Sequence, residues 1–363
     1  MKIALITSSI MLTACVADVG RVGGEPRDTG NCSTEAFHLD ISTEADLKDI
    51  PSGCYHLQGD LTIRRSTLTD LSKLDGLRTV ENLIVEDNAD LTSFAGLTDV
   101  EVKGELRVEG NPALADLDGL VYTEELELLR LVGNGALRDL GGLEKLERVD
   151  GELVISDNAK LPNLRGLGAL TRVSGRLTIE ANALLGDLSG LDQLTSVGEL
   201  TIDGNARLTS LSALTRLSSS GTVSIEDNPQ LGSLDGIRLS TVAGDLQIRR
   251  NGLTSILGVS TLLRVEGRLV IDDNDRLQQL DSFSPGLWVG SNLEITNNQA
   301  LASVQQLYRA QMVGASLVVT GNPALTQCRA DDLQDCIPVV GLRTITSNGV
   351  NWDPCDQQGC ADQ

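Results

Sequence analysis

The sequence predicts an all-β protein: a right-handed parallel β-solenoid of about 12 coils, each of roughly 23–24 residues, with disulfide-capped ends. The repeating unit is clearest in residues 198–214, GELTIDGNARLTSLSAL. Leu200 and Ile202 alternate with polar residues, which is the pattern of a half-buried strand. Asn205 then turns the chain, and leucines follow at intervals of three. The repeats lack the pattern of a long amphipathic helix, so we expect short strands and a rod that curves little.

An asparagine marks each coil. From Ser66, which takes its place in the first coil, to Asn322 the chain advances 322 − 66 = 256 residues over 11 intervals, or roughly 23 residues per coil. The column consists of Asn88, Asn111, Asn134, Asn158, Asn182, Asn205, Asn228, Asn251, Asn274, Asn298 and Asn322. An aliphatic residue precedes each by three positions, and leucine almost always precedes it by five. These aliphatic columns should stack into a core that no single coil could bury alone.

Two polar or small columns also have structural interpretations. The asparagine side chain can bond backbone groups at the turn and repeat from coil to coil, since buried amides need partners. Glycine is usual seven residues before the asparagine, and we interpret that column as a turn that requires positive φ. Its members are Gly104, Gly151, Gly175, Gly198, Gly221, Gly244 and Gly267.

The consensus G-x-L-x-I-x-x-N-x-x-L-x-x-L-x-G-L covers about residues 54–325 and resembles the receptor L domain. That family is the leucine-rich-repeat-related β-helix of insulin- and growth-factor-receptor ectodomains, and the coil length lies in the leucine-rich-repeat range. Cys54, shortly before residues 58–63, is similar to the entry of such a domain. The resemblance implies extracellular recognition, without the kinase segments of signalling members.

The N-terminus indicates export. Residues 1–14 have a Lys2 start and an apolar run that is too short to span a bilayer, as in a signal peptide. Residues 12–15, LTAC, resemble the lipobox of bacterial lipoproteins, in which cleavage before the cysteine leaves it diacylated. Cys15 is therefore the predicted lipid attachment site, and residues 15–31 the flexible tether. Val16 after the cysteine favours the bacterial outer membrane or cell surface. The alternative to a lipoprotein is an ordinary cleaved signal peptide in which Cys15 is incidental.

The ends of the solenoid should be capped, because capping elements must cover an open core. We predict an N-terminal cap at residues 32–60, repeats at 61–327 and a C-terminal cap at 328–363, in which Trp352 could plug the end. With Cys15 lipidated, six cysteines remain, an even number that favours disulfides in an exported chain. They are Cys32, Cys54, Cys328, Cys336, Cys355 and Cys360.

Cys32 and Cys54 should pair, since the other four lie a solenoid length away. The remaining four allow three connectivities, of which we favour the local pairs Cys328–Cys336 and Cys355–Cys360. A zinc site is the competing interpretation, but there is no Cys-x-x-Cys and only two histidines.

The composition argues against several functions. A net charge of −22 disfavours nucleic acid and anionic lipid headgroups as partners, which leaves the lipid anchor as the membrane contact. Both histidines lie in the N-terminal cap, so no Ser/His/Asp set can form along the coils. Carboxylates belong to the repeat and mark no single position, and phosphate-binding or dinucleotide motifs are absent. We therefore expect no enzymatic activity and no cofactor, apart from a weak interaction with Ca²⁺.

The candidate binding face is an acidic column two residues before each asparagine, with neighbouring acids. Its residues are Glu86, Glu109, Glu180, Asp203, Glu226, Asp227, Asp272 and Asp273. Glu180, Asp203 and Glu226 fall on consecutive coils and repel one another. One interpretation is a solvated face eased by Arg249 and Arg250. The other is a weak Ca²⁺ site at these three carboxylates, or a docking strip for a basic partner.

Three functions stay open. The first is a non-catalytic, membrane-anchored recognition or adhesion lipoprotein that presents a long repeat face to an unidentified protein or glycan. The second is a structural envelope protein whose rod shape is its function. The third is a solenoid-type carbohydrate-active enzyme, against which the regular spacing from Ser66 to Asn322 argues.

Overall fold

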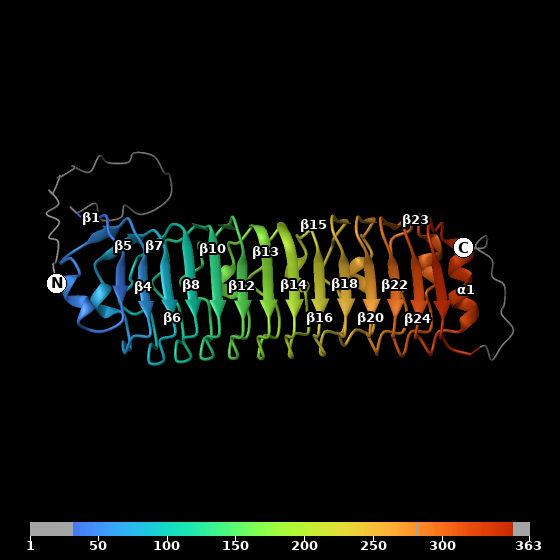
Figure 1. Ribbon diagram of the computed structural model, residues 1–363, viewed down its shortest axis with the longest axis horizontal. Coiled ribbons are helices and arrows are strands. Elements are labelled where there is room, and N and C mark those ends of the chain that lie inside the picture. The colour runs from blue at the N-terminus through green and yellow to red at the C-terminus, as the bar shows by residue number, and fades with distance from the viewer. Residues whose placement is uncertain (1–31, 281, 351–363) are drawn as a thin grey trace, which may run out of the picture.

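The computed structural model describes residues 32–280 and 282–350. It is an all-β parallel solenoid of about 14 turns, as predicted in class, but with more turns than the predicted 12 or so. Each turn contributes one strand to a single long sheet, and the row of strands runs nearly straight from one end to the other (Figure 1). The predicted signal peptide, Cys15, the tether, Trp352, Cys355 and Cys360 lie outside the described residues.

The main sheet is entirely parallel, and strands that lie side by side in it come from successive turns of the solenoid. Its strands are β2 (Leu39–Ile41), β4 (Leu61–Arg64), β6 (Leu83–Glu86), β8 (Glu105–Glu109), β10 (Leu128–Val132), β12 (Leu153–Ser156), β13 (Arg172–Glu180), β14 (Ser196–Asp203), β16 (Val223–Glu226), β18 (Leu246–Arg249), β20 (Leu269–Asp272), β22 (Leu293–Thr296), β24 (Leu317–Thr320) and β25 (Arg343–Thr346). The extra turns are those of β2, which pairs with β4 inside the predicted N-terminal cap, and of β25, which pairs with β24.

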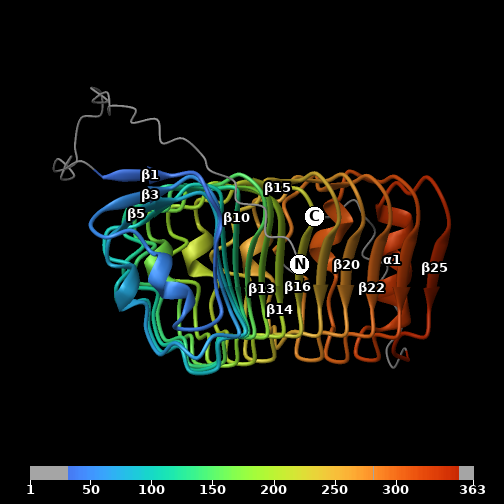
Figure 2. The ribbon, with the colours of Figure 1, turned by 60° about the vertical axis from the view of Figure 1, so that its left-hand side comes forward.

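A second parallel ladder of short strands runs along another side of the coils (Figure 2). Its first sheet contains β1 (Ser33–Glu35), β3 (Tyr55–Leu57), β5 (Leu77–Val80) and β7 (Glu101–Val102). It continues through β9 (Glu125–Leu126), β11 (Arg148–Val149), the first residues of β13 and β14, β15 (Ser219–Ser220), β17 (Thr241–Val242), β19 (Arg264–Val265), β21 (Trp288–Val289) and β23 (Met312–Val313). β13 and β14 therefore belong to both ladders.

Helices are short. The 3₁₀ turns are η1 (Asp46–Asp49), η2 (Ser72–Leu74), η3 (Arg165–Leu167), η4 (Ser212–Leu214), η5 (Leu257–Val259) and η6 (Gln305–Arg309). One α-helix among the described residues, α1 (Gln327–Cys336), covers the C-terminal end of the core (Figure 1). At the other end, Asp46 Oδ2 accepts the backbone N–H groups of Ser42 and Thr43 at 2.9 and 2.7 Å, which holds η1 against the first turn.

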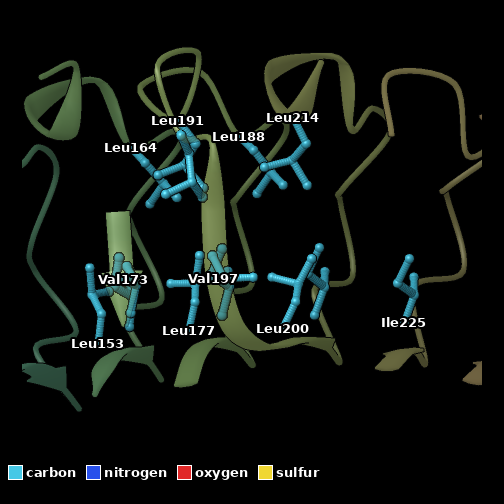
Figure 3. Packing of buried hydrophobic residues seen from close by; sticks show 14 of the residues in the cluster. Leu153, Leu164, Val173, Leu177, Leu188, Leu191, Val197, Leu200, Leu214 and Ile225 are labelled. Atoms are coloured by element: carbon cyan, nitrogen blue, oxygen red, sulfur yellow. The ribbon is translucent and has the colours of Figure 1, made fainter. Parts of the chain in front are cut away.

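The core consists of the predicted aliphatic columns. Leu153, Leu177 and Leu200 lie side by side in register and are fully buried, as are the residues two positions further along each strand (Figure 3). Because the side chains of a strand alternate, the same register turns the intervening residues outward. Stacking of like on like explains why coil length hardly varies.

The asparagine column is a continuous buried ladder, and the structural interpretation of it is confirmed. Asn205 Nδ2 donates to the backbone oxygen of Ile179 in the preceding turn at 2.9 Å and to that of Asp203 at 3.0 Å. Its Oδ1 accepts the backbone N–H of Asn182 at 3.1 Å. The pattern repeats from Asn88 to Asn348, so each amide satisfies backbone groups that the turn leaves unpaired.

The explanation of the glycine column was wrong. The residue with positive φ is instead the one immediately before each asparagine, with φ between 50° and 71°. These residues are Arg65, Asp87, Gly110, Gly133, Asp157, Ala181, Gly204, Asp227, Arg250, Asp273, Asn297, Gly321 and Ser347. The predicted glycines are required by close approach: a Cβ on Gly198 would lie 2.4 Å from the carbonyl oxygen of Ser174, and one on Gly221 2.1 Å from that of Gly198.

The cysteines divide between the two ends. The Cys32–Cys54 disulfide is present, with Cα atoms 4.7 Å apart, as predicted. Cys328 and Cys336 are also disulfide-bonded, but the predicted bond between them is wrong. Both lie on α1, where eight residues at about 1.5 Å each separate their Cα atoms by about 12 Å. A disulfide requires less than about 7 Å.

Candidate functional site

The predicted acidic column exists as a physical row on the outer face of the main sheet. Strand register places Glu180 beside Asp203, and Asp203 beside Glu226. The same row continues to Arg249 and Asp272. Most of its side chains are half-buried rather than fully exposed, because neighbouring turns shield them. The structure therefore brings Glu86, Glu109, Glu180, Asp203, Glu226 and Asp272 into one line, while Asp227 and Asp273 lie at the adjacent turn. The partners of each acid decide what it can do.

The N-terminal part of the column is neutralised by arginines of adjacent turns. Glu86 Oε2 accepts from Arg64 Nη2 at 2.6 Å, and Glu109 Oε1 accepts from Arg130 Nε at 2.7 Å. Arg130 also lies 3.4 Å from Glu152. Since these carboxylates already have cationic partners, Glu86 and Glu109 form a structural ion-pair lattice and are poor candidates for binding a ligand.

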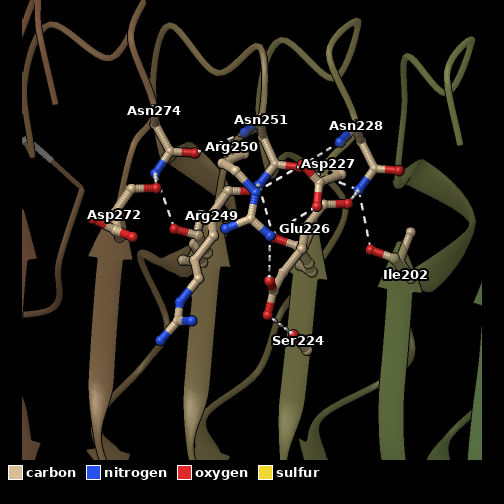
Figure 4. A network of polar contacts seen from close by, with 12 residues as sticks. Ile202, Ser224, Glu226, Asp227, Asn228, Arg249, Arg250, Asn251, Asp272 and Asn274 are labelled. Atoms are coloured by element: carbon tan, nitrogen blue, oxygen red, sulfur yellow. Dashed lines mark hydrogen bonds and ion pairs between the residues drawn. The ribbon is translucent and has the colours of Figure 1, made fainter. Parts of the chain in front are cut away.

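Arg250 neutralises the next acidic pair (Figure 4). Its Nη2 lies 2.9 Å from Glu226 Oε2 and 2.8 Å from Asp227 Oδ2, while its Nε donates to Asp227 Oδ1 at 2.8 Å. The hydrogen bonds from Arg250 lower the pKa of Asp227. Ser224 Oγ donates to the other oxygen of Glu226 at 2.6 Å. Both carboxylates of this pair are thus committed within the protein.

The C-terminal acids have different surroundings. Asp272 Oδ1 accepts from Thr296 Oγ1 at 2.5 Å and from Asn297 Nδ2 at 3.1 Å. Arg249 stands between Glu226 and Asp272 in the row, yet its side chain extends along the strand and its buried Nε has no hydrogen-bond partner (Figure 4). Arg249 therefore does not ease the repulsion in the way that the sequence suggested; Arg250 does.

Asp273 lines an open hollow of about 340 Å³ among the turns. Its lining residues are Pro229, Arg250, Asn251, Gly252, Asp273, Asp275 and Arg276. The hollow has a visible cause in the sequence: Leu253 follows Asn251 after one residue, whereas in the neighbouring coils two residues separate the asparagine from the next leucine. The shortened turn leaves a notch in the row.

Glu180 and Asp203 differ from the rest of the column. Within the described residues, neither carboxylate has a cation or hydrogen-bond donor bound to it. Burial raises the pKa of Asp203, and repulsion from Asp227, Glu180 and Glu226 raises it further, against a smaller opposing effect of Arg250. These two carboxylates are the uncompensated centre of the face.

The calcium hypothesis gains no support from the geometry. Across residues 32–280 and 282–350, no cluster of three or more His, Cys, Asp or Glu side chains is placed to hold a metal ion. Glu226, the third proposed ligand, is bound by Arg250 and Ser224 instead. Of the predicted set, Glu180 and Asp203 on the column and Asp273 at the hollow remain as candidates for binding a partner.

The sequence did not single out a second group of large side chains, which face outward and range from half-buried to exposed. Register aligns Arg264, Trp288 and Met312 on the second ladder, and the guanidinium carbon of Arg264 lies 3.9 Å from the centre of the Trp288 ring. Leu263 beside them is 51% exposed. Alignment of the coils would place these residues at equivalent positions, but the strands of the second ladder here have only two residues each, too few to show an alternating pattern in the sequence.

No helix in the described part of the chain is long and apolar enough to cross a membrane.

Comparison with known proteins adds little to this description. No protein-family model matches the chain, and no curated protein matches it. Among solved structures it is similar to an internalin from Listeria monocytogenes, with 13% sequence identity over 85% of this chain and 84% of that chain and a TM-score of 0.34. The assignment of a parallel β-solenoid rests on the strand pairing itself, and the receptor L-domain resemblance stays a prediction.

Proposed function

We propose that this protein is a non-catalytic recognition or adhesion module, displayed at the bacterial surface through a lipid on Cys15, whose main-sheet face binds a basic protein. Glu180 and Asp203 form the centre of the binding surface. The lipid holds the body at the membrane, so the elongated sheet is free to meet partners.

The observation that carries the proposal is the contrast between the inward and outward columns. Inward positions repeat the same few residues in every turn, as packing requires. Outward positions on the same strands change from turn to turn: Arg130 is followed by Val154, Thr178 and Thr201 in one register column. The variation gives each stretch of the face its own chemistry, which a partner can distinguish, whereas the core columns are the same throughout.

The centre of the face is chosen on electrostatic grounds. Elsewhere on the column each acid has an internal arginine, hydroxyl or amide, but Glu180 and Asp203 have none among the described residues. A lysine or arginine of a partner would remove their mutual repulsion, so part of the binding free energy is already stored in the free protein. The net charge of −22 would also speed the approach of a basic partner.

A structural rod is the second candidate, and one observation favours it. The ion-pair lattice of Glu86, Glu109, Arg64 and Arg130 ties successive turns together along the outside. Such a lattice stiffens the solenoid without serving a ligand. On this alternative the variation of outward residues would have no consequence for binding.

The experiment compares the soluble body, residues 32–363, with two charge-matched variants. One carries Glu180→Gln and Asp203→Asn; the other carries Asp90→Asn and Asp235→Asn, which remove two exposed turn carboxylates away from the face. Immobilised proteins are exposed to envelope and extracellular fractions, and a captured partner is titrated at several salt concentrations. The proposal expects the first variant to bind at least about tenfold more weakly and with a smaller salt dependence. Equal retention by all three proteins would favour the rod.

A further inference from the structure

The open hollow of about 340 Å³ beside Asp273 interrupts the regular edge of the solenoid. Among the coils of the asparagine column, Asn251 alone is followed by leucine after one residue instead of two, and the missing residue opens a slot between the turns on either side. A Cβ on Gly252 would lie 2.1 Å from the carbonyl oxygen of Pro229, so the short turn requires glycine. Asn251 is 5% exposed, whereas the other asparagines of the column are fully buried. The slot therefore reaches down to the ladder itself.

Asp273 occupies the same place in its coil as Asp227 does two coils earlier. Each comes immediately before the asparagine, and their φ angles are 56° and 53°. Asp227 accepts two hydrogen bonds of 2.8 Å from Arg250 of the next coil. The residue one coil after Asp273 is Asn297, whose side-chain amide donates to Asp272 instead. In the part of the chain that the structure describes, the carboxylate of Asp273 thus lacks the arginine that its counterpart has.

The lining of the slot favours a cation. Asp273 and Asp275 contribute two carboxylates, and among the described residues neither is held in an ion pair. Arg250 also lines the slot, but its guanidinium is bound to acids of the preceding coil (Figure 4). Arg276 is then the single opposing charge, so the slot keeps an excess of negative charge. Pro229 gives it an apolar wall, against which the methylene groups of a long basic side chain can pack.

We infer that the slot receives an arginine side chain of the basic partner, whose guanidinium binds Asp273 and Asp275 in the way that Arg250 binds Asp227. Arginine fits better than lysine, because its planar group donates two parallel hydrogen bonds to one carboxylate, as the internal pair already shows. The inference rests on the proposed function, since it assigns a second contact to the same basic partner.

The slot fixes the position of the partner along the solenoid. A repetitive face lets a bound segment shift by one coil, about 4.8 Å, and meet the same backbone again. The coils of Glu180 and Asp203 lie three and two coils before that of Asn251, or about 10–14 Å away. In an extended segment, residues four apart are about 13 Å apart and lie on the same side. We therefore expect the partner to carry two arginines with this spacing. The other short turn, at Ser66, lies eight coils from the slot.

Titration of the ¹⁵N-labelled full chain with N-acetylarginine amide tests the slot by itself. The backbone amide signals of Gly252, Asp273 and Asp275 should shift in a saturable way, and the apparent affinity should fall as salt is added. N-acetylcitrulline amide has the same shape without the charge and should cause no saturable shift. Equal shifts with both probes, or none with the arginine probe, would overturn the inference.

Two variants test the shape and the charge of the slot separately. Insertion of alanine between Gly252 and Leu253 restores the N-G-A-L turn of residues 134–137 and fills the slot at constant charge. Asp273→Asn removes the charge and leaves the backbone unchanged. Each should weaken binding of the arginine probe at least about fivefold, and parent-like affinity of either would refute the assignment. Deletion of Ala136 is the matched control, because it creates the same short turn beside different side chains and should create no new site.

Peptides with two arginines separated by zero to six serines test the spacing. The parent chain should bind the peptide with three intervening serines most tightly. The Glu180→Gln/Asp203→Asn variant should lose this preference and still bind N-acetylarginine amide at the slot. Affinity of the parent chain that is independent of spacing would overturn the inference. The observed preference, together with no captured protein from envelope or extracellular fractions, would support the slot and count against the proposed function, so the two failures are distinguishable.

Discussion

The side-chain amide of Gln327 donates from Nε2 to the backbone oxygen of Ile345 at 3.1 Å. From β4 to β24 the equivalent carbonyl accepts from the asparagine of the following turn, as Ile63 does from Asn88 and Val319 from Asn348, both at 2.9 Å. Asn348 Nδ2 in turn lies 3.5 Å from Gln327 Oε1. The first residue of α1 thus takes the place that the asparagine of a following turn would occupy, and the carbonyl of Ile345 keeps a donor.

Replacement of Gln327 by alanine should therefore destabilise the protein by about 1 kcal/mol, because the carbonyl of Ile345 loses its donor at a half-buried site. Asn205→Ala, in the middle of the ladder, should cost more, about 2–4 kcal/mol, since several buried backbone groups lose their partner at once. Urea unfolding measures both, with exposed Gln305→Ala as the control. A Gln327→Ala loss that equals or exceeds the Asn205→Ala loss would contradict the assigned roles.

Adjacent residues of β14 should respond in opposite ways. Ile202 is fully buried, so Ile202→Asp places a carboxylate among stacked aliphatic side chains. This change should lower the free energy of unfolding by about 3–5 kcal/mol. Asp203→Ala removes an outward acid from a repulsive group and should leave stability unchanged or raise it. Urea melts of the two variants decide the strand register, because a register shifted by one residue would exchange their effects.

The pH dependence of Asp203→Asn has a definite sign. The pKa of Asp203 is raised in the folded protein, so its contribution favours folding below the unfolded pKa of about 3.9 and is lost as the pH rises through the folded pKa. The variant should thus be more stable than the parent at pH 7, and the difference should vanish towards about pH 3.

Asp227→Asn provides the opposite control. Arg250 lowers the pKa of Asp227, so this carboxylate stabilises the fold above its unfolded pKa and the benefit disappears as the pH falls through the lower folded value. Asp227→Asn should therefore be destabilising at pH 7 and neutral in acid. The melting temperatures of Asp203→Asn and Asp227→Asn, each relative to the parent, are measured between about pH 3 and pH 7. Profiles of the same sign for both variants would disprove the opposite pKa shifts of the two carboxyls.

Ala181→Gly should stabilise the protein by about 0.5–1 kcal/mol, because Ala181 has φ of 53° and glycine adopts that conformation without a steric penalty. Ala206, an exposed turn residue without positive φ, is the matched control. Ala206→Gly should destabilise by a similar amount through the added freedom of the unfolded chain. The two melting temperatures should move in opposite directions.

The Cys15→Ser chain tests the predicted anchor. It should appear in the soluble fraction of expressing cells, whereas the parent chain should partition with detergent-extracted membranes and carry the added mass of the lipid. Membrane partitioning of both proteins at unmodified mass would remove the lipoprotein interpretation.

The sequence was sufficient to predict what repeats. Ile202 and Asn205 recur so regularly that their burial and stacking follow from period alone, and the acidic row follows from the same register. The last turns at each end were harder, because β2 has no asparagine after it and β25 has Arg343 where leucine is usual. The repeat pattern is least informative at the two terminal turns, because a turn at the end of the solenoid packs against only one neighbour and does not need every core residue.

The partners of the acids could not be predicted from the sequence. Whether Arg249 or Arg250 neutralises Glu226 depends on the direction of two neighbouring side chains, one of which sits at positive φ. The disulfides of Cys328 and Cys336 likewise depend on the helix between them, which the short segment after Asn322 did not announce. Such pairings depend on the direction in which each side chain points in the folded protein, and the spacing of residues along the sequence does not reveal it.

The asparagine ladder joins each turn only to its immediate neighbours, so the solenoid is a series of equivalent units from which one unit can be removed. Excision of residues 183–205 would bring Asn228 onto the carbonyl of Ile179, an isoleucine equivalent to the Ile202 that it now bonds. The product should fold with the same core and be shorter by one strand spacing, about 4.8 Å. Gain or loss of whole coils would therefore adjust the distance between the two ends of such a protein, while both ends keep their caps.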